Sequence, residues 1–418
     1  MDTPPDSPKA PGRTLLFVFI TVLLSMVGFG IIMPIMPSLM MDVTGQTLSE
    51  ATTYGGILYG VYALAQFIMS PVMGGLSDRY GRRPVLLVSL FFYAVDFLLL
   101  ALAPTYAWLV FARFLSGATS ATFSTANAVI ADVSPPEKRS ANFGLMGAAF
   151  GLGFIIGPVM GGLFAEIDIR APFYAAAALG FANFVFGYFA FPETSTSKRD
   201  FSWKRANPFG TLVSVSRHGL VPVVLVTYFL IQFAYNALPA VFSYFAQLKY
   251  DWSALDIGIA LAFVGIVSAG VQGGLTRKII PAIGEQRSVL LGAATMVVSF
   301  IGYGFFSPSG GYIYLWVAVG ALGGLMVPAM QGIMSAAVPS DSQGELQGAV
   351  ASVMSLTMLT SPIIMTRTFT LYTDSEGIYF PGAPMLLSCI CLVIAMIPFA
   401  IVTTRKKAEA QASPGVSA

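Results

Sequence analysis

Long apolar runs separated by short polar intervals extend along the whole chain. Each run covers about 20 residues, the length that an α-helix needs to cross a hydrocarbon core roughly 30 Å thick. The runs are too long and too uniformly apolar for outer-membrane strands, which alternate apolar and polar positions. The pattern therefore predicts an all-α integral membrane protein with twelve transmembrane helices, near residues 14–37, 52–76, 84–103, 105–131, 141–165, 171–191, 220–243, 256–276, 287–307, 311–337, 345–369 and 380–404.

The composition agrees with a chain that is surrounded by lipid. Hydrophobic residues make up 56% of the sequence, charged residues make up only 10%, and the mean hydropathy is +0.76. Soluble globular domains carry about 25% charged residues, so this class of protein is excluded. We expect the lipid bilayer as a partner and no nucleic acid, because the net charge of only +2 comes from basic residues that mark membrane topology.

The distribution of lysine and arginine indicates the orientation. If both termini are cytoplasmic, eighteen of these residues fall on the cytoplasmic side, and only Arg170 and Lys249 fall in outer loops. Cytoplasmic loops of membrane proteins carry an excess of Lys and Arg. We therefore expect a multi-pass protein with both termini in the cytoplasm.

A weak internal repeat divides the chain into halves. The run at 74–79 recurs in weakened form at 273–278, each time after the second long helix of its half. The longest polar interval separates the halves. We expect an N-terminal six-helix bundle at 1–191, a cytoplasmic linker at 192–219, and a C-terminal six-helix bundle with a short cytoplasmic tail at 220–418.

The polar interval between the second and third predicted helices carries a specific motif. It reads G-x-L-S-D-R-x-G-R-R and resembles the signature of the major facilitator superfamily at the same loop. The resemblance implies that family's fold of two pseudo-symmetric six-helix bundles, and a cytoplasmic gate. A charge cluster that only enforces topology would explain the arginines but not an aspartate and a glycine among them. The implied gate residues are Gly74, Asp78, Arg79, Gly81, Arg82, Arg83 and, as a partner at the end of the fourth helix, Asp132.

A second motif, made of small residues, lies on the fifth predicted helix. It reads G-x-x-x-G-P-x-x-G-G and consists of Gly153, Gly157, Pro158, Gly161 and Gly162. Small residues at helical spacing let another helix approach closely, so helix packing alone is one interpretation. The run also resembles the antiporter signature of drug exporters in the same superfamily. That resemblance favours export over uptake.

The resemblance narrows to the tetracycline–proton antiporter branch and covers nearly the whole chain. It is carried by the runs at 28–37, 113–117, 130–132, 143–146, 207–208 and 343–348. It implies a monomer in the bacterial inner membrane that exports small amphipathic organic molecules, tetracycline-like or other drugs, in exchange for protons. The chain departs from that branch at Ser25, Ser268 and Met296, which stand where those pumps carry an aspartate, a histidine and an aspartate. By this resemblance, the aspartates and the histidine that are missing here belong to the metal–drug and proton sites of the pumps. The departures therefore put tetracycline itself in doubt as the substrate.

Asp96, Arg113 and Arg367 are the charged side chains that fall inside the predicted spans, beyond their first residues. A charge at the bilayer centre costs roughly 2.5–3.5 kcal/mol on insertion scales, so each is a functional candidate. Asp96 stands at a position that is acidic in the tetracycline branch. Arg113 matches an intramembrane arginine of the superfamily, and this resemblance implies a role as a charge relay. We predict proton coupling at these two residues; the alternative for Asp96 is simple pairing with a polar neighbour. Arg367 either extends to the outer headgroups, or attracts an anionic substrate or locks against Asp374 or Glu376.

Uncharged polar side chains at mid-membrane depth are candidates for a substrate cavity. Amides can orient an amphipathic organic molecule in a largely apolar pocket, and hydrogen bonding between helices is the competing explanation. Together with Arg367, the predicted substrate-binding residues are Tyr62, Gln66, Asn127, Gln232, Asn236, Gln272 and Gln331.

Motifs of enzymatic chemistry are missing from the sequence. It has no phosphate-binding loop, no H-E-x-x-H, no nucleophile elbow, and too few His and Cys residues for a metal cluster. We expect no enzyme, no cofactor and no metal site. The predicted function is secondary transport of a small molecule driven by proton exchange, and the alternative is an uncoupled facilitator or sensor of the same fold.

Overall fold

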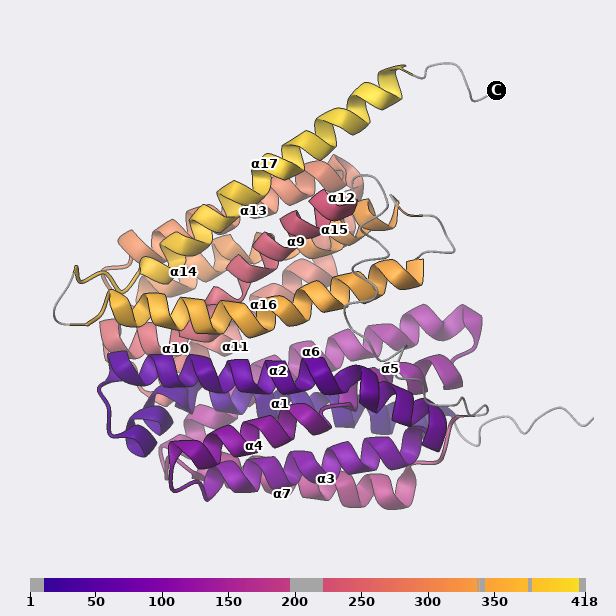
Figure 1. Ribbon diagram of the computed structural model, residues 1–418, viewed down its shortest axis with the longest axis vertical. Coiled ribbons are helices and arrows are strands. Elements are labelled where there is room, and N and C mark those ends of the chain that lie inside the picture. The colour runs from indigo at the N-terminus through magenta and orange to yellow at the C-terminus, as the bar shows by residue number, and fades with distance from the viewer. Residues whose placement is uncertain (1–10, 196–220, 337, 339–342, 375–377, 413–418) are drawn as a thin grey trace, which may run out of the picture. The chain divides into compact units, whose positions relative to one another are not determined.

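The protein is built from helices throughout the part of the chain that the structure describes. The computed structural model describes residues 11–195, 221–336, 338, 343–374 and 378–412, and contains no strand within them (Figure 1). The helices in chain order are α1 (Pro11–Thr44), α2 (Leu48–Tyr80), α3 (Arg82–Ala101), α4 (Tyr106–Thr119), α5 (Thr122–Val133), α6 (Pro136–Ala165), α7 (Ala171–Ala190), α9 (Val221–Tyr235), α10 (Ala237–Tyr250), α11 (Ala254–Gly270), the π-helical turn η1 (Val271–Leu275), α12 (Thr276–Ile283), α13 (Glu285–Phe305), α14 (Gly311–Gly320), the 3-10 turn η2 (Ala321–Leu325), α15 (Met326–Ser335), α16 (Gln343–Leu371) and α17 (Ala383–Ala412).

The predicted membrane spans are present with one difference. Eleven helices within the described residues are long and apolar enough to cross a membrane. The remaining prediction, a span over 105–131, is not one continuous helix, because α4 ends at Thr119 and α5 begins at Thr122. The break lies in a stretch of Gly, Ser and Thr residues, which favour helix interiors less than Ala or Leu do. The all-helical membrane fold is confirmed, and the prediction of an unbroken fourth helix was wrong.

Contacts within the chain group it into two compact units. Unit 1 comprises the described residues of Met1–Gln46, Val61–Asn207 and Trp252–Gly265, and unit 2 those of Thr47–Gly60, Pro208–Asp251 and Ile266–Ala418. Helices α2 and α11 therefore contribute residues to both units. The division at 1–191, 192–219 and 220–418 stays a prediction, and most of the predicted linker lies outside the described residues.

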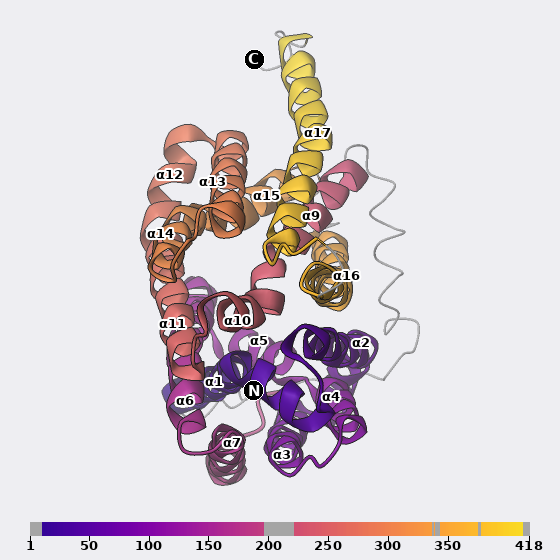
Figure 2. The same ribbon diagram turned by 90° about the vertical axis from the view of Figure 1, so that its left-hand side faces the viewer.

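Close helix pairs form unit 1. Helix α1 packs along α6, and α3 packs along α7, which lies beside it in both ribbon views (Figures 1 and 2). One apolar core joins α1, α3, α5 and α6 around Phe17, Leu86 and Ile130, each with at most 1% of its surface exposed. This core positions α3, the helix that carries Asp96.

Unit 2 is organised around α9, which packs against both α16 and α17. The first turns of α2 belong to this unit and are bonded to the end of α16. The hydroxyl of Ser49 lies 2.6 Å from that of Thr373, and Thr370 donates a hydrogen bond to the carbonyl oxygen of Ser49 (2.7 Å). Unit 2 also contains the two irregular turns η1 and η2, which contact each other.

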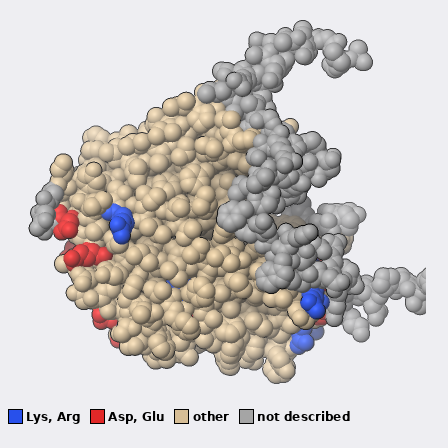
Figure 3. Space-filling view, in the orientation of Figure 1, with Lys and Arg blue, Asp and Glu red and all other residues tan. Residues whose placement is uncertain are grey.

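Charged side chains avoid the middle of the visible surface. In the space-filling view, acidic and basic residues of the described part gather towards the helix ends, and the area between them is uncharged (Figure 3). A lipid-facing surface requires this distribution, because a charge in hydrocarbon is costly.

Candidate functional site

A buried ion pair lies in unit 1. Arg113 of α4 donates a hydrogen bond from Nη2 to Oδ2 of Asp96 on α3, and the Asp96 side chain is 1% exposed. The other carboxyl oxygen, Oδ1, and the Arg113 Nε atom have no partner among the described residues. Aromatic rings cover the guanidinium, whose Cζ lies 5.8 Å from the Tyr62 ring centroid and 6.0 Å from that of Phe97. The two residues predicted to couple protons are thus in direct contact.

The break between α4 and α5 presents a hydroxyl group to α2. Ser120 stands at the break, where its Oγ accepts a hydrogen bond from Gln66 Nε2 (3.1 Å) and lies 3.2 Å from the Tyr62 hydroxyl. Helix α4 reaches α2 closely here, since a Cβ at Gly117 would collide with the backbone at Tyr62. Tyr62 and Gln66 were predicted to line a substrate cavity; here they form one polar cluster with Ser120, beside the Asp96–Arg113 pair.

The positions that depart from the tetracycline branch carry no ionisable side chain that could replace the missing groups. The hydroxyl of Ser25 donates to the Thr21 carbonyl of its own helix (2.8 Å). Met296 is buried, at 7% exposure, against Gly323 of η2. Asp96 and Arg113 are the charged side chains among the buried residues of the described chain.

The loop between α2 and α3 brings together three of the predicted gate residues, Asp78, Arg82 and Asp132. Arg82 bonds to Asp78 on α2 (2.6 Å) and to Asp132 at the end of α5 (3.1 Å). Gly81 turns the chain with φ +108°, a conformation that side-chain-bearing residues rarely adopt. One arginine therefore links the ends of α2, α3 and α5.

Glu193 also belongs to this loop and was not singled out from the sequence. Its Oε1 accepts the backbone N–H of Arg82 (2.8 Å) and its Oε2 that of Arg83 (3.1 Å). These are unpaired donors of the first turn of α3, where a carboxylate is stabilised by the helix dipole. Glu193 comes directly after the last apolar helix of its half, within the interval that had been interpreted only as linker.

The glycine motif of α6 makes close helix contacts. A Cβ at Gly161 would lie 2.6 Å from the Ile31 carbonyl oxygen of α1, and one at Gly162 would lie 2.6 Å from Leu255 Cα of α11. At Gly157 a Cβ would lie 2.9 Å from Gly30 Cα. The packing interpretation of the motif therefore holds, and its antiporter role stays a prediction.

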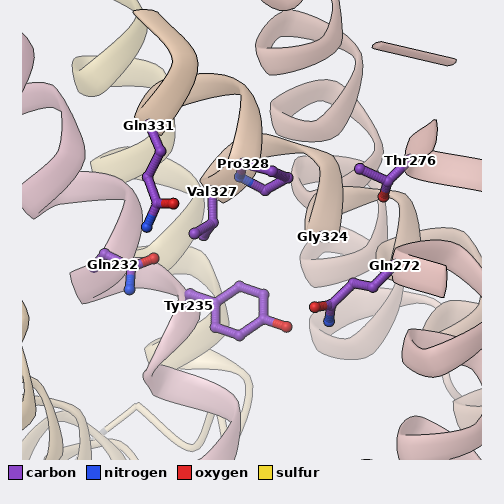
Figure 4. Close-up of a pocket in the computed structure, with 8 residues that line it drawn as sticks. All are labelled: Gln232, Tyr235, Gln272, Thr276, Gly324, Val327, Pro328 and Gln331. Carbon is purple, nitrogen blue, oxygen red and sulfur yellow. The ribbon is translucent and has the colours of Figure 1, made fainter. Parts of the chain in front are cut away.

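Unit 2 contains a cavity of about 400 Å³. Three of the predicted substrate-binding residues, Gln232, Gln272 and Gln331, line it from different helices, and their amides converge on one space (Figure 4). The other lining residues are Tyr235, Thr276, Gly324, Val327 and Pro328. No specific sequence pattern indicated Tyr235 or Thr276. Tyr235 precedes Asn236, which had been noted for its amide, and Thr276 lies within the second copy of the repeat.

Several predicted site residues lie outside the ion pair, the Arg82 loop and the cavity. The side chain of Asn236 is not part of the cavity lining and donates instead to the Gln232 carbonyl oxygen (2.7 Å), where α9 ends. Asn127 is exposed on α5, and Arg367 is exposed on α16. Arg79 is exposed and stacks on Tyr80, with its Cζ 5.3 Å from the ring centroid. A Cβ at Gly74 would meet no atom within 4 Å, and Glu376, a predicted partner of Arg367, lies outside the described residues.

Comparison with known proteins decides the family. Residues 18–362 match the sequence pattern of the Major Facilitator Superfamily. The chain belongs to this superfamily. As a Major Facilitator Superfamily protein it is a multi-pass membrane transporter of a small-molecule substrate and not an enzyme.

Relatives within the Major Facilitator Superfamily confirm the predicted branch. The tetracycline resistance protein, class C, of Escherichia coli is 36% identical over 382 residues, which cover 90% of this chain and 96% of that protein. The class B protein of the same species is 34% identical over 346 residues, with 82% and 86% covered. Among solved structures, the human organic anion transporter MFSD10 (TETRAN) aligns with a TM-score of 0.71 at 21% identity, over 95% of this chain and 100% of that one. This last likeness shows the fold alone.

Proposed function

We propose that the protein exports small amphipathic organic molecules, tetracycline-like or other drugs, by alternating access in exchange for protons. The similarity to tetracycline resistance proteins over 90% of the chain supports drug export. The predictions of a bacterial inner membrane, cytoplasmic termini and a monomer accompany this proposal. The cavity of unit 2 is proposed as part of the substrate site.

The observation that carries proton exchange is the buried pair of Asp96 and Arg113. Protonation of the carboxyl group would remove the negative charge that holds the guanidinium, and the unpaired Oδ1 atom offers a position for the proton. A buried ion pair is strongly disfavoured when one partner loses its charge, because the other charge is then left uncompensated. A proton would therefore shift the balance between two arrangements of α3 and α4, as a coupling ion must.

The Arg82 ion pairs support a cytoplasmic gate. Arg82 holds Asp78 and Asp132 through charge-assisted hydrogen bonds at partly exposed positions. Such bonds can stabilise one conformation of a loop and be released in another. Gating at this loop would link rearrangement of α2, α3 and α5 to opening towards the cytoplasm.

The test is substrate-dependent proton flux in proteoliposomes. Tetracycline and unrelated amphipathic drugs are added to vesicles that contain a trapped pH dye, and drug movement is followed in parallel. The wild-type protein should couple the two fluxes. Asp96→Asn should abolish proton flux, whereas Asp251→Asn, at an exposed residue with φ +54° that asparagine tolerates, should retain it.

A second candidate function is an uncoupled facilitator. Ser25 and Met296 favour it, since neither can carry the proton that an aspartate would carry at these positions. Drug movement without proton flux in the wild-type protein would support the facilitator and contradict the exchanger. Proton flux that persists in Asp96→Asn would contradict the role of the ion pair.

A further inference from the structure

The cavity of unit 2 lies where three helices depart from regular α-helical geometry. Helix α9 ends at Tyr235, η1 is a π-helical turn between α11 and α12, and η2 is a 3-10 turn between α14 and α15. The hydroxyl of Thr276, the first residue of α12, donates to the carbonyl oxygen of Val271, the first residue of η1 (3.0 Å). Single π-helical turns inside α-helices occur frequently at functional sites, and interrupted membrane helices line substrate cavities.

The side chains turned into the cavity are polar but uncharged. In Figure 4, Gln331 points towards Gln232, and the hydroxyl of Tyr235 points towards Gln272 across the open space. Val327 and Pro328 form an apolar wall beside them. The lining thus contains amide, phenol and hydroxyl groups and no Asp, Glu, Lys, Arg or His.

Gln232 contributes to this lining a buried acceptor that has no protein partner. Its residue surface is only 7% exposed, yet its Oε1 atom accepts no hydrogen bond from the described residues. A buried amide oxygen without a partner costs free energy, so such atoms in native structures require an explanation. A ligand with an N–H or O–H group would satisfy this oxygen.

Charge decides which ligands fit. A charged group that leaves water for this cavity would lose its hydration and meet no opposite charge in the lining, which makes its burial unfavourable. An uncharged molecule loses little and can use the amides, each of which both donates and accepts hydrogen bonds. The volume of about 400 Å³ lies within the range of small-molecule sites.

We propose that this cavity binds an uncharged organic molecule that donates a hydroxyl or N–H group to Gln232 Oε1 and exchanges further hydrogen bonds with Gln272 and Gln331. The proposal rests on the proposed function, because it names the substrate class of that transporter. It predicts that the protein selects its ligand by charge.

The test measures equilibrium binding of three probes that share one fluorophore. Dansylamide is neutral, dansyl sulfonate is an anion and dansylcholine is a cation. Each is titrated into purified full-length protein in lipid nanodiscs, and empty nanodiscs give the background from lipid. The wild-type protein should bind dansylamide with a Kd at least tenfold lower than that of either charged probe.

Variants connect the selectivity to the cavity. Gln272→Glu should lower the Kd of dansylcholine at least tenfold, because it adds the missing opposite charge. Gln232→Leu should raise the Kd of dansylamide about tenfold, because it removes the buried acceptor. The matched control is Gln46→Glu, the same charge change at an exposed residue between α1 and α2, which should leave all three constants unchanged.

Three outcomes would overturn the proposal: a wild-type preference for a charged probe, no binding of dansylamide, or a selectivity that Gln272→Glu and Gln232→Leu leave unaltered. No gradient is present in this measurement, so the result is independent of proton exchange. Asp96→Asn should still bind dansylamide. A protein that binds dansylamide but moves no protons fails in coupling, whereas a protein that does not bind dansylamide fails at the cavity.

Discussion

The two units differ in where their polar side chains find hydrogen-bond partners. In unit 1, Asp96 is paired with Arg113, and Gln66 is bonded to Ser120, so polar groups of one helix are held by those of another. In unit 2, the amides of Gln232 and Gln272 face a cavity. Polar groups that bond one another suit a mechanism that rearranges internally, whereas groups that face a cavity suit recognition of a ligand.

The backbone at the α1–α6 contact of unit 1 differs from the backbone at the cavity of unit 2. Glycines of α6 bring α1 into backbone contact in unit 1, as at Gly157 and Gly161. The irregular turns η1 and η2 of unit 2 instead adjoin the cavity, which Gln272 and Gly324 help to line. Close packing between α1 and α6 and an unfilled volume at the cavity predict different responses to the same kind of substitution.

The largest expected effect concerns the ion pair. Arg113→Gln should lower the free energy of unfolding by about 3 kcal/mol, because it leaves the buried carboxylate of Asp96 without a partner. The double variant Asp96→Asn/Arg113→Gln should recover most of this loss and still fail to couple protons to transport. Unfolding by SDS in mixed micelles measures the stability, and proteoliposome flux measures coupling.

Gln272→Leu is the matched change in unit 2. It removes a polar side chain that faces a cavity, so it should change the free energy of unfolding by less than about 0.5 kcal/mol. If Arg113→Gln and Gln272→Leu lowered the free energy of unfolding by the same amount, the contrast between the units would not hold. A double variant as unstable as the single one would show that the pair contributes by packing and not by charge.

The second prediction concerns the contact between α1 and α6. Gly157→Ala should lower the free energy of unfolding by about 1–3 kcal/mol, since the added methyl group would overlap the α1 backbone. Gly147, on the same helix, has no atom within 4 Å of an added Cβ, so Gly147→Ala should be neutral or stabilise by up to about 1 kcal/mol. SDS unfolding of both variants tests this, and a Gly157→Ala protein as stable as Gly147→Ala would refute the close contact.

Much of the fold could be predicted from the sequence because the bilayer imposes length and polarity on each helix. The apolar runs predicted the spans. The loop motif predicted the ion pairs of Arg82 with Asp78 and with Asp132. The break at Ser120 was missed, since hydropathy does not register a change of backbone geometry inside an apolar run. The π-helical turn at Gln272 was missed for the same reason.

Sequence reasoning succeeded less well for residues whose partners are remote in the chain. Gln232 and Asn236 were both predicted to bind substrate, but α9 ends between them and the Asn236 amide bonds to the backbone. Glu193 caps a helix that begins 111 residues before it. Such contacts depend on packing between helices, which the local pattern of polar and apolar residues does not encode.

The third prediction concerns this Glu193 cap in unit 1. Glu193→Ala should lower the free energy of unfolding by about 1 kcal/mol, because two N–H groups at the start of α3 lose their acceptor. Glu193→Gln keeps one acceptor oxygen and should cost less. Stability in SDS and drug flux are measured for both; if both variants matched the wild type, the carboxylate would not hold the loop.

The smallest effect on stability is expected at the cavity of unit 2. In Gly324→Ala the new Cβ would lie 3.7 Å from Gln272 Cγ, an ordinary contact, so the free energy of unfolding should change by less than about 0.5 kcal/mol. The methyl group would occupy part of the cavity, and the Kd of dansylamide should rise severalfold. The adjacent Gly323→Ala is the control, because its Cβ would lie 2.9 Å from the buried Met296 Sδ and should lower stability without narrowing the cavity. If Gly324→Ala instead lost as much stability as Gly157→Ala and bound the probe normally, this region would be packed core like the α1–α6 contact, and the contrast between the two units would not hold.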